Sequence, residues 1–169
     1  MPTPRVNVER VQGPTRRRLI KGLTAFNNGA VGKSKAQHLT VTLRQRGEIV
    51  GGLSGYTWMN WLYVDLLWIS DEHRGKNLGR SLITKAENEA RKRGVRNVYL
   101  STFSFQAPGF YKKLGYKEFG KQKDFPAGHT RFWLQKGFVI FRRYPFCAVA
   151  GGGSGVSLTD AGDDTPIVT

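Results

Sequence analysis

The segment that most restricts the fold of this chain is a glycine-containing turn between two regular elements. Residues 58–69 are rich in aromatic and β-branched side chains, which favours a central strand. Residues 79–93 repeat apolar side chains at helical spacing, which predicts an amphipathic helix. The residues between them include RGKNLGR at 74–80. A turn that opens a helix directs backbone N–H groups and the positive end of the helix dipole to one point, where an anion can bind.

The residue types in this turn suit a phosphate-bearing ligand. Glycine lets the main chain approach a ligand closely, and asparagine tolerates the left-handed conformation. The spacing is neither that of a P-loop nor that of a dinucleotide fingerprint. With two glycines alone, a plain helix entry with solvated charges is the commoner explanation. The residues expected to contact the anion are Arg74, Gly75, Lys76, Asn77, Leu78, Gly79 and Arg80.

Hydrophobic periodicity along the rest of the chain predicts one mixed α/β domain. Residues 5–11 alternate as in a half-buried strand, and residues 15–26 have helical spacing. Further strands are predicted at 38–45, 48–57, 95–102, 116–120 and 130–135, and a short helix at 106–114. Because several strands are consecutive, we expect a mixed sheet flanked by helices.

The composition changes near residue 137. We expect a domain over 1–136 and an extension over 137–169, whose glycine-rich run at 151–155 and acidic end predict a largely disordered tail. The apolar run at 138–146 could extend the sheet or meet a second subunit, so a homodimer is possible. The extension contains no lysine and more Asp than Arg, so the positive charge belongs to the domain.

The net charge of +15, from 27 Lys and Arg against 12 Asp and Glu, favours an anionic partner. Nucleic acid and a polyanionic cofactor both qualify, but no nucleic-acid-binding motif is present. The one cysteine, Cys147, cannot form an internal disulfide, and no residues have metal-site spacing. With no secretion signal and no apolar run near the about 20 residues that span a bilayer, a cytoplasmic, metal-free protein without membrane contact is expected.

The turn at 74–79 and a second segment, APGFYKKLGY at 107–116, together resemble the GNAT acetyltransferase superfamily. The first is similar to its Arg/Gln-x-x-Gly-x-Gly/Ala signature and the second to its Ala-x-x-Phe/Leu-Tyr motif, with one helix and one strand between them. The resemblance covers residues 5–136. It implies the acyl-CoA N-acyltransferase fold, a single mixed, mostly antiparallel sheet of six to seven strands flanked by helices.

The resemblance also implies a binding mode for acetyl-CoA as cosubstrate. Its diphosphate would lie on the turn at 74–80, and its pantetheine arm in a gap between strands 62–69 and 97–102. A backbone N–H near Leu67 or Ile69 would bind the thioester oxygen. Two residues depart from the family pattern. Asn77 replaces the first signature glycine, and Ser104 stands where an Asn often contacts the pantetheine arm.

Two catalytic residues follow from the same comparison and from the strand pattern. Tyr111 matches the family's tyrosine that can protonate the departing thiolate. Asp65 is a lone carboxylate inside an apolar strand, so it is expected to be buried and is the best candidate for the base that deprotonates the amine. A structural Asp65, or one that only attracts a cationic substrate, is an equal alternative. Glu72 is the second candidate base, and His73 is expected to be a surface residue.

The expected reaction is transfer of the acetyl group to a primary amine of a small molecule. The alternatives are a protein or peptide amine, such as that of a ribosomal protein, and, as a less favoured choice, a basic nucleic-acid-associated module. The acceptor pocket is expected to involve residues 19–31, Asp65 and its neighbours, and residues 121–130. Aromatic side chains that could form a wall for a cationic amine include Phe26, Tyr56, Trp58, Trp61, Tyr63, Phe103, Phe105, Phe125 and Trp133.

Overall fold

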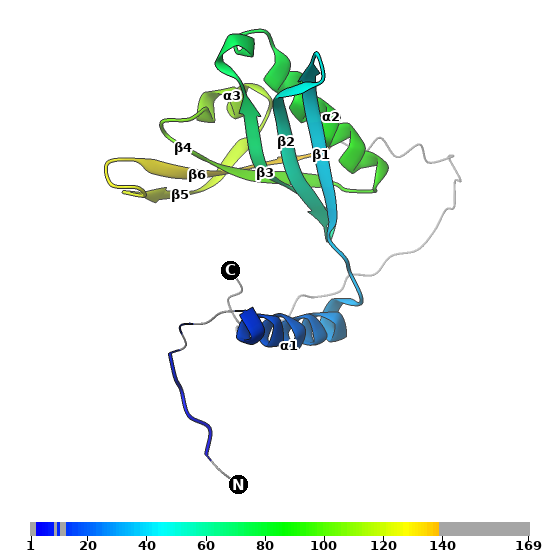
Figure 1. The fold of residues 1–169 in the computed structure, drawn as a ribbon, viewed down its shortest axis with the longest axis vertical. Coiled ribbons are helices and arrows are strands. Elements are labelled where there is room, and N and C mark those ends of the chain that lie inside the picture. The colour runs from blue at the N-terminus through cyan, green and yellow to red at the C-terminus, as the bar shows by residue number, and fades with distance from the viewer. Residues whose placement is uncertain (1–2, 9, 11–12, 139–169) are drawn as a thin grey trace, which may run out of the picture.

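The fold is a mixed sheet flanked by helices, as the sequence predicts. The computed structural model describes residues 3–8, 10 and 13–138 (Figure 1). The elements in chain order are α1 (Gly13–Val31), β1 (Gln37–Gln45), β2 (Glu48–Trp58), β3 (Trp61–Ile69), the short 3₁₀ helix η1 (Asp71–His73), α2 (Leu78–Lys92), β4 (Asn97–Phe103), α3 (Pro108–Lys113), β5 (Lys117–Lys123) and β6 (Thr130–Gly137).

The six strands of the described residues form one sheet in the order β1-β2-β3-β4-β6-β5. Only β3 and β4 run parallel, and every other neighbouring pair is antiparallel. The parallel pair is joined through α2, which crosses from the end of β3 to the start of β4. The expectation of a mixed, mostly antiparallel sheet is therefore confirmed.

β3 and β4 pair only over the first part of their length. Their register runs from Trp61 opposite Asn97 to Val64 opposite Leu100 and then stops. Beyond this point β3 stays paired with β2 and β4 stays paired with β6. The two strands thus separate toward their C-terminal ends, as expected for strands 62–69 and 97–102.

A β-bulge lies at the point where the strands separate. Ser54 and Gly55 of β2 are opposite Leu66 and Val64 of β3, so Asp65 is the extra residue. A Cβ atom on Gly55 would overlap the backbone carbonyl of Tyr63, which explains why a residue without a side chain is found there. Bulges bend and twist a strand locally, which helps β3 to leave β4.

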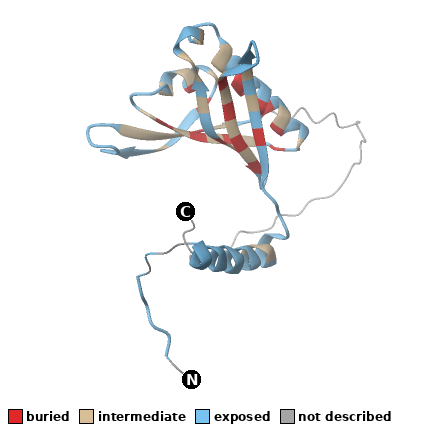
Figure 2. Cartoon of the chain, in the orientation of Figure 1, coloured by how far each residue is buried: buried red, intermediate tan, exposed pale blue. Residues whose placement is uncertain are grey.

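The core lies between α2 and one face of the sheet. Figure 2 shows the buried residues concentrated on the central strands and on the side of α2 that faces them. The apolar face predicted for α2 is confirmed, because Leu82, Ile83, Ala86 and Ala90 are buried. The main members of this core are Leu53, Leu62, Leu82, Ile83, Ala86, Ala90, Val98, Leu100 and Leu134.

α1 is longer than the predicted helix at 15–26 and lies apart from the sheet (Figure 1). None of its residues is buried, and its apolar side chains Leu19, Ile20, Leu23 and Phe26 are exposed. Residues 19–31, which were expected to help form the acceptor pocket, line neither of the two cavities described below.

The two ends of the described chain differ from the sequence-based expectations. Residues 5–8 and 10 form no strand, and Val6 and Val8 are fully exposed. The predicted strand at 5–11 is wrong there because alternation produces a strand only where a neighbouring strand supplies hydrogen bonds. At the other end β6 reaches Gly137, and the buried Phe138 donates its N–H to the Arg96 carbonyl at 2.7 Å.

The rest of the C-terminal extension, residues 139–169, lies outside the described residues, together with the predicted disordered tail and Cys147. Within the described ranges, no helix is long and apolar enough to span a membrane.

Candidate active site

The separation of β3 from β4 creates a cleft of about 770 Å³. Residues 64–69 of β3 form one wall, and residues 100–102 of β4 form the other. The turn before α2 lies at one end of the cleft, and α3 contributes Phe110 and Tyr111. The cleft therefore brings together the two segments that carry the family resemblance, which are 28 residues or more apart in the chain.

The turn has the backbone conformation that an anion site needs. Gly75 and Asn77 have φ angles of 76° and 59°, so both are left-handed, and Asn77 takes this conformation where the family usually has glycine. Asn77 is the N-cap of α2 but makes no capping hydrogen bond through its side chain. The Ser81 N–H bonds to the Asn77 carbonyl, so the N–H groups of residues 78–80 have no partner within the helix.

The charges around the turn also favour an anion. The first turn of α2 has no acidic residue, so nothing competes for the positive end of its dipole. Arg74 lines the cleft and is held there by hydrogen bonding from its Nε to the Ile69 carbonyl at 3.1 Å and by an ion pair with Asp71 at 2.8 Å. Lys76 and Arg80 are exposed and do not line the cleft; Lys76 Nζ donates to the Glu72 carbonyl at 2.9 Å.

The wall formed by β3 directs backbone N–H groups into the cleft. The Ser70 N–H donates to Val50 of β2 at 2.9 Å, so it points away from β4. Successive N–H groups of a strand point to opposite edges, so those of Leu67 and Ile69 point toward the cleft. The Ile69 carbonyl, which accepts from Arg74, lies on the same edge. Both residues line the cleft, as expected from the sequence.

Tyr111 is buried in α3 and lines the same cleft. Its ring contacts those of Phe110 and Tyr116 edge-on, with centroids 5.1 and 5.8 Å away, so its position is fixed by packing. Burial raises the pKa of Tyr111 to about 12. The hydroxyl is therefore protonated at neutral pH and can donate a proton to a group in the cleft.

Asp65 lines the cleft but is not buried. The prediction of a buried carboxylate is wrong because Asp65 alternates with the buried Leu62 and Val64 and lies on the opposite sheet face, which α2 does not cover. The pKa of Tyr63 is raised first by burial and then by the charge of Asp65 and a hydrogen bond to it. The Asp65 carboxylate therefore lies beside the Tyr63 hydroxyl.

His73, expected at the surface, is half-buried and lines the cleft. Its Nδ1 lies 2.8 Å from Ser70 Oγ and its Nε2 lies 2.6 Å from Gln45 Oε1. These contacts fix the ring, with Nε2 donating to the amide oxygen of Gln45. Glu72, the second candidate base, is exposed and does not line the cleft.

The structure separates Ser104 from the cleft and brings in Gln106. Ser104 is exposed, and its Oγ accepts a hydrogen bond from the Thr130 N–H at 3.2 Å. Gln106 lines the cleft, and its Oε1 accepts from the Phe103 N–H at 2.9 Å and from Thr102 Oγ1 at 3.1 Å. The sequence reasoning missed Gln106, although a polar residue just before the second motif was a usable signal.

The sheet thus opens between its two parallel strands, with free helix N–H groups at one end of the opening. The comparisons with known proteins show the family. A family profile described as "Acetyltransferase (GNAT) family" matches residues 13–116. This match spans more than half of the chain, so the protein belongs to the GNAT family of acetyltransferases.

Individual relatives support this assignment. The chain is 42% identical to the blasticidin-S acetyltransferase of Streptomyces morookaense over 100 residues, which cover 59% of this chain and 74% of that protein. It is 35% identical to an acetyltransferase of Agrobacterium fabrum over 117 residues, which cover 69% and 85%. The crystal structure of an acetyltransferase from Bacillus cereus ATCC 14579 superposes with a TM-score of 0.70 at 30% identity, covering 79% and 98%.

A more distant solved structure shares the fold. An aminoglycoside 6'-N-acetyltransferase, complexed with coenzyme A, matches with a TM-score of 0.53 at 21% identity, covering 59% of this chain and 72% of that one.

Proposed function

We propose that this protein transfers the acetyl group of acetyl-CoA to a primary amine of a small molecule, by direct attack in a ternary complex. The proposal rests on the groups that one cleft brings together. It has unpaired helix N–H groups at one end, and it also contains the backbone donors of β3, the buried Tyr111 and the carboxylate of Asp65. The blasticidin-S acetyltransferase, named for a small-molecule substrate, supports a small acceptor.

Binding of the cosubstrate would use the backbone more than side chains. The N–H groups of residues 78–80 and the guanidinium of Arg74 would hold the diphosphate. The backbone at Gly75 and Asn77 shapes the turn, and Gly79 leaves room beside Phe110. The N–H groups of Leu67 and Ile69 would bind the thioester oxygen and stabilise the negative charge that develops on it.

The proton transfers would fall to two side chains. An amine with a pKa near 10 is mostly protonated at neutral pH, so Asp65 would take the ammonium proton, directly or through water, and release it to solvent. The neutral nitrogen then bonds to the acetyl carbon and loses its second proton to solvent. When the carbon–sulfur bond breaks, Tyr111 would donate its proton to the departing thiolate and regain one from solvent. The sum is an amide, free coenzyme A, one proton released to solvent and no net change in the enzyme.

The test combines binding and turnover. Calorimetry and thermal melting of the full chain with acetyl-CoA should show binding and a higher melting temperature. Release of free thiol is then compared across a panel of small amines and a panel of peptides. Preference for peptides would favour the protein-amine alternative. Neither heat nor protection from melting with acetyl-CoA would overturn the proposal, and RNA binding at physiological salt would then favour a nucleic-acid role.

A further inference from the structure

We propose that the acceptor carries a flat, positively charged group, which binds in an aromatic pocket next to the cleft while its amine reaches Asp65. The inference rests on the proposed function and adds the chemical class of the acceptor. The pocket has a volume of about 560 Å³. It is lined by Tyr56, Trp58, Met59, Trp61, Tyr63, Tyr99, Phe119 and Gln135.

The pocket lies on the sheet face that α2 does not cover. Leu62 and Val98 point into the core beneath α2. Because side chains alternate along a strand, Trp61 and Tyr63 of β3 and Tyr99 of β4 point to the opposite face. No element of the described chain covers this pocket, and Trp58 is exposed at its rim.

The rings of the pocket are packed against one another in fixed positions. Tyr63 lies 5.3 Å from Tyr56 and 4.9 Å from Tyr99 between ring centroids. Trp61 meets Tyr99 edge-on at 5.7 Å. A preformed group of aromatic rings binds a flat ligand with little loss of side-chain entropy.

The electrostatic character of the pocket favours one kind of ligand. None of its lining side chains is charged, although the chain has 27 Lys and Arg. Burial, with a hydrogen bond to Tyr56, raises the pKa of Tyr99 to about 12, so its hydroxyl is neutral. The electrostatic attraction therefore comes from the negative faces of the rings, which bind cations.

The pocket adjoins the cleft at two residues of β3, Tyr63 and Asp65. Tyr63 lines the pocket, while Asp65, whose charge raises the pKa of Tyr63, lines the cleft. The positive charge of Arg131 lowers the pKa of Tyr63, against the larger effects of burial and of Asp65. Its guanidinium is occupied by Ser101 Oγ at 2.8 Å and by the ring of Trp133 at 4.6 Å. An acceptor can thus place a flat cation in the pocket and its amine at Asp65.

The test uses two amines of the same shape. The first is 4-(2-aminoethyl)-1-methylpyridinium, and the second is 4-methylphenethylamine, in which a neutral ring replaces the charged one. Binding to the full chain in the presence of coenzyme A is measured by calorimetry, and kcat/KM by thiol release with acetyl-CoA. We expect the charged ring to bind about tenfold more tightly, the effect of one or two desolvated cation–π contacts.

Variants locate the effect. Trp58→Leu at the exposed rim should reduce the preference for the charged ring several-fold without changing acetyl-CoA affinity. Trp61→Leu should reduce the preference for the charged ring more than Trp58→Leu does. Thermal melting checks that the Trp61→Leu variant is folded. Phe26→Leu on α1 is the matched control, because this exposed aromatic lies outside the pocket. It should leave the preference unchanged.

The outcomes separate the two proposals. Equal binding of both amines, or a preference for the charged ring that persists in Trp58→Leu and Trp61→Leu, overturns the inference. The proposed function still holds in that case if the protein binds acetyl-CoA and acetylates an amine. A change of oligomeric state in the Trp58 and Phe26 variants, with no effect on either amine, would instead assign the pocket to α1 of a second copy and overturn the inference as well.

Discussion

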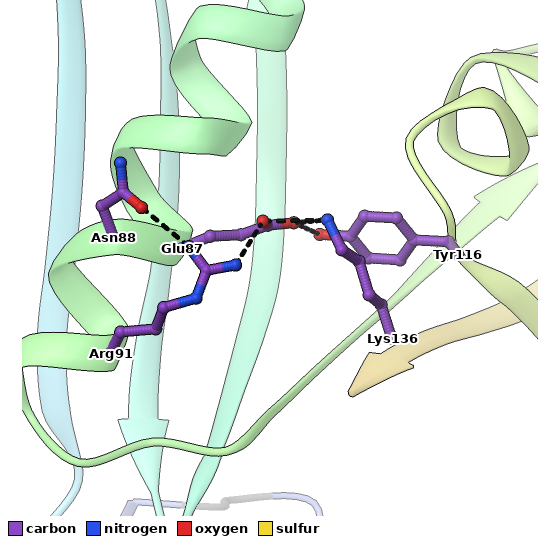
Figure 3. Close-up of polar contacts among 5 residues, drawn as sticks. All are labelled: Glu87, Asn88, Arg91, Tyr116 and Lys136. Carbon is purple, nitrogen blue, oxygen red and sulfur yellow. Dashed lines mark hydrogen bonds and ion pairs between the residues drawn. The ribbon is translucent and has the colours of Figure 1, made fainter. Parts of the chain in front are cut away.

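The buried carboxylate of Glu87 on α2 and the half-buried ammonium of Lys136 on β6 form an ion pair, with Nζ 2.9 Å from both carboxylate oxygens (Figure 3). Tyr116 donates to the same carboxylate at 3.0 Å, and Arg91 approaches it at 3.4 Å. The contact with Glu87 raises the pKa of Tyr116 further, after the larger effect of its burial. The pair ties α2, whose N-terminus forms the proposed anion site, to a strand 49 residues later in the chain.

Replacing Lys136 should destabilise the protein strongly. Lys136→Met leaves the buried Glu87 carboxylate without its main countercharge, so we expect the free energy of unfolding to fall by about 3 kcal/mol or more. Urea unfolding measures the change. The matched control is Lys92→Met, which breaks an exposed pair with Glu89 and should cost less than about 1 kcal/mol. An equal loss of unfolding free energy in both variants would show that the Glu87–Lys136 pair stabilises the fold no more than an exposed pair does.

Removal of the Tyr111 hydroxyl should slow turnover more than it weakens cosubstrate binding. Tyr111→Phe keeps the packed ring but cannot donate a proton, so kcat should fall about 100-fold, the lower range for a general acid. Steady-state kinetics with acetyl-CoA and a small amine measure this. Tyr116→Phe is the control, because it loses a hydroxyl that bonds Glu87 outside the cleft. Unchanged kcat in Tyr111→Phe would remove Tyr111 from catalysis.

Asp65→Asn distinguishes a base from a residue that only attracts the substrate. If Asp65 accepts the proton, the variant should lose activity and show a flatter rise of kcat with pH. If the carboxylate only binds a cation, KM for the amine should rise while the pH profile of kcat keeps its shape. Glu48→Gln, an exposed carboxylate at the start of β2, is the control. A wild-type pH profile in Asp65→Asn rules out the base role.

A side chain at position 79 should obstruct the cleft. A Cβ atom on Gly79 would lie 3.1 Å from the ring of Phe110 and 3.6 Å from Ile69, both of which line the cleft. Gly79→Leu should therefore weaken coenzyme A binding about tenfold or more. Gly29→Leu on α1 is the control, since a Cβ atom on Gly29 would meet no other atom within 4 Å. An unaltered dissociation constant in Gly79→Leu would contradict the proposed cosubstrate site.

The raised pKa of Tyr111 predicts a loss of stability at high pH. Its ordinary pKa is near 10, and burial raises it to about 12 in the folded protein. The folded state thus favours the neutral form, so this contribution is complete below pH 10 and is lost as the pH rises to 12. The free energy of unfolding should fall by about 2 kcal/mol over this range. The Tyr111→Phe variant should lose less unfolding free energy over the same pH range. An equal loss in the variant would contradict a raised pKa for Tyr111.

Much of the site could be predicted from the sequence because its chemistry is local. The left-handed Asn77, the N-terminus of α2 and the buried face of that helix depend on neighbouring residues and on helical spacing. Tyr111 and the turn each belong to a short motif, so the family resemblance of both could be recognised from the sequence. Only the structure shows that they line the same cleft. The position of Ser104 outside the cleft lining could not be predicted in this way, because its contact with Thr130 joins residues that are 26 positions apart in the chain.

What the sequence alone determined is most of the elements and the backbone of the turn, since φ preferences and side-chain periodicity act over a few residues. Tertiary structure decided the rest. The bulge at Asp65 needs β2 beside β3, and the predicted strand at 5–11 does not form at residues 5–8 because no strand of the described chain lies beside them. The aromatic pocket likewise joins rings from several strands and their connections, whose packing depends on long-range register.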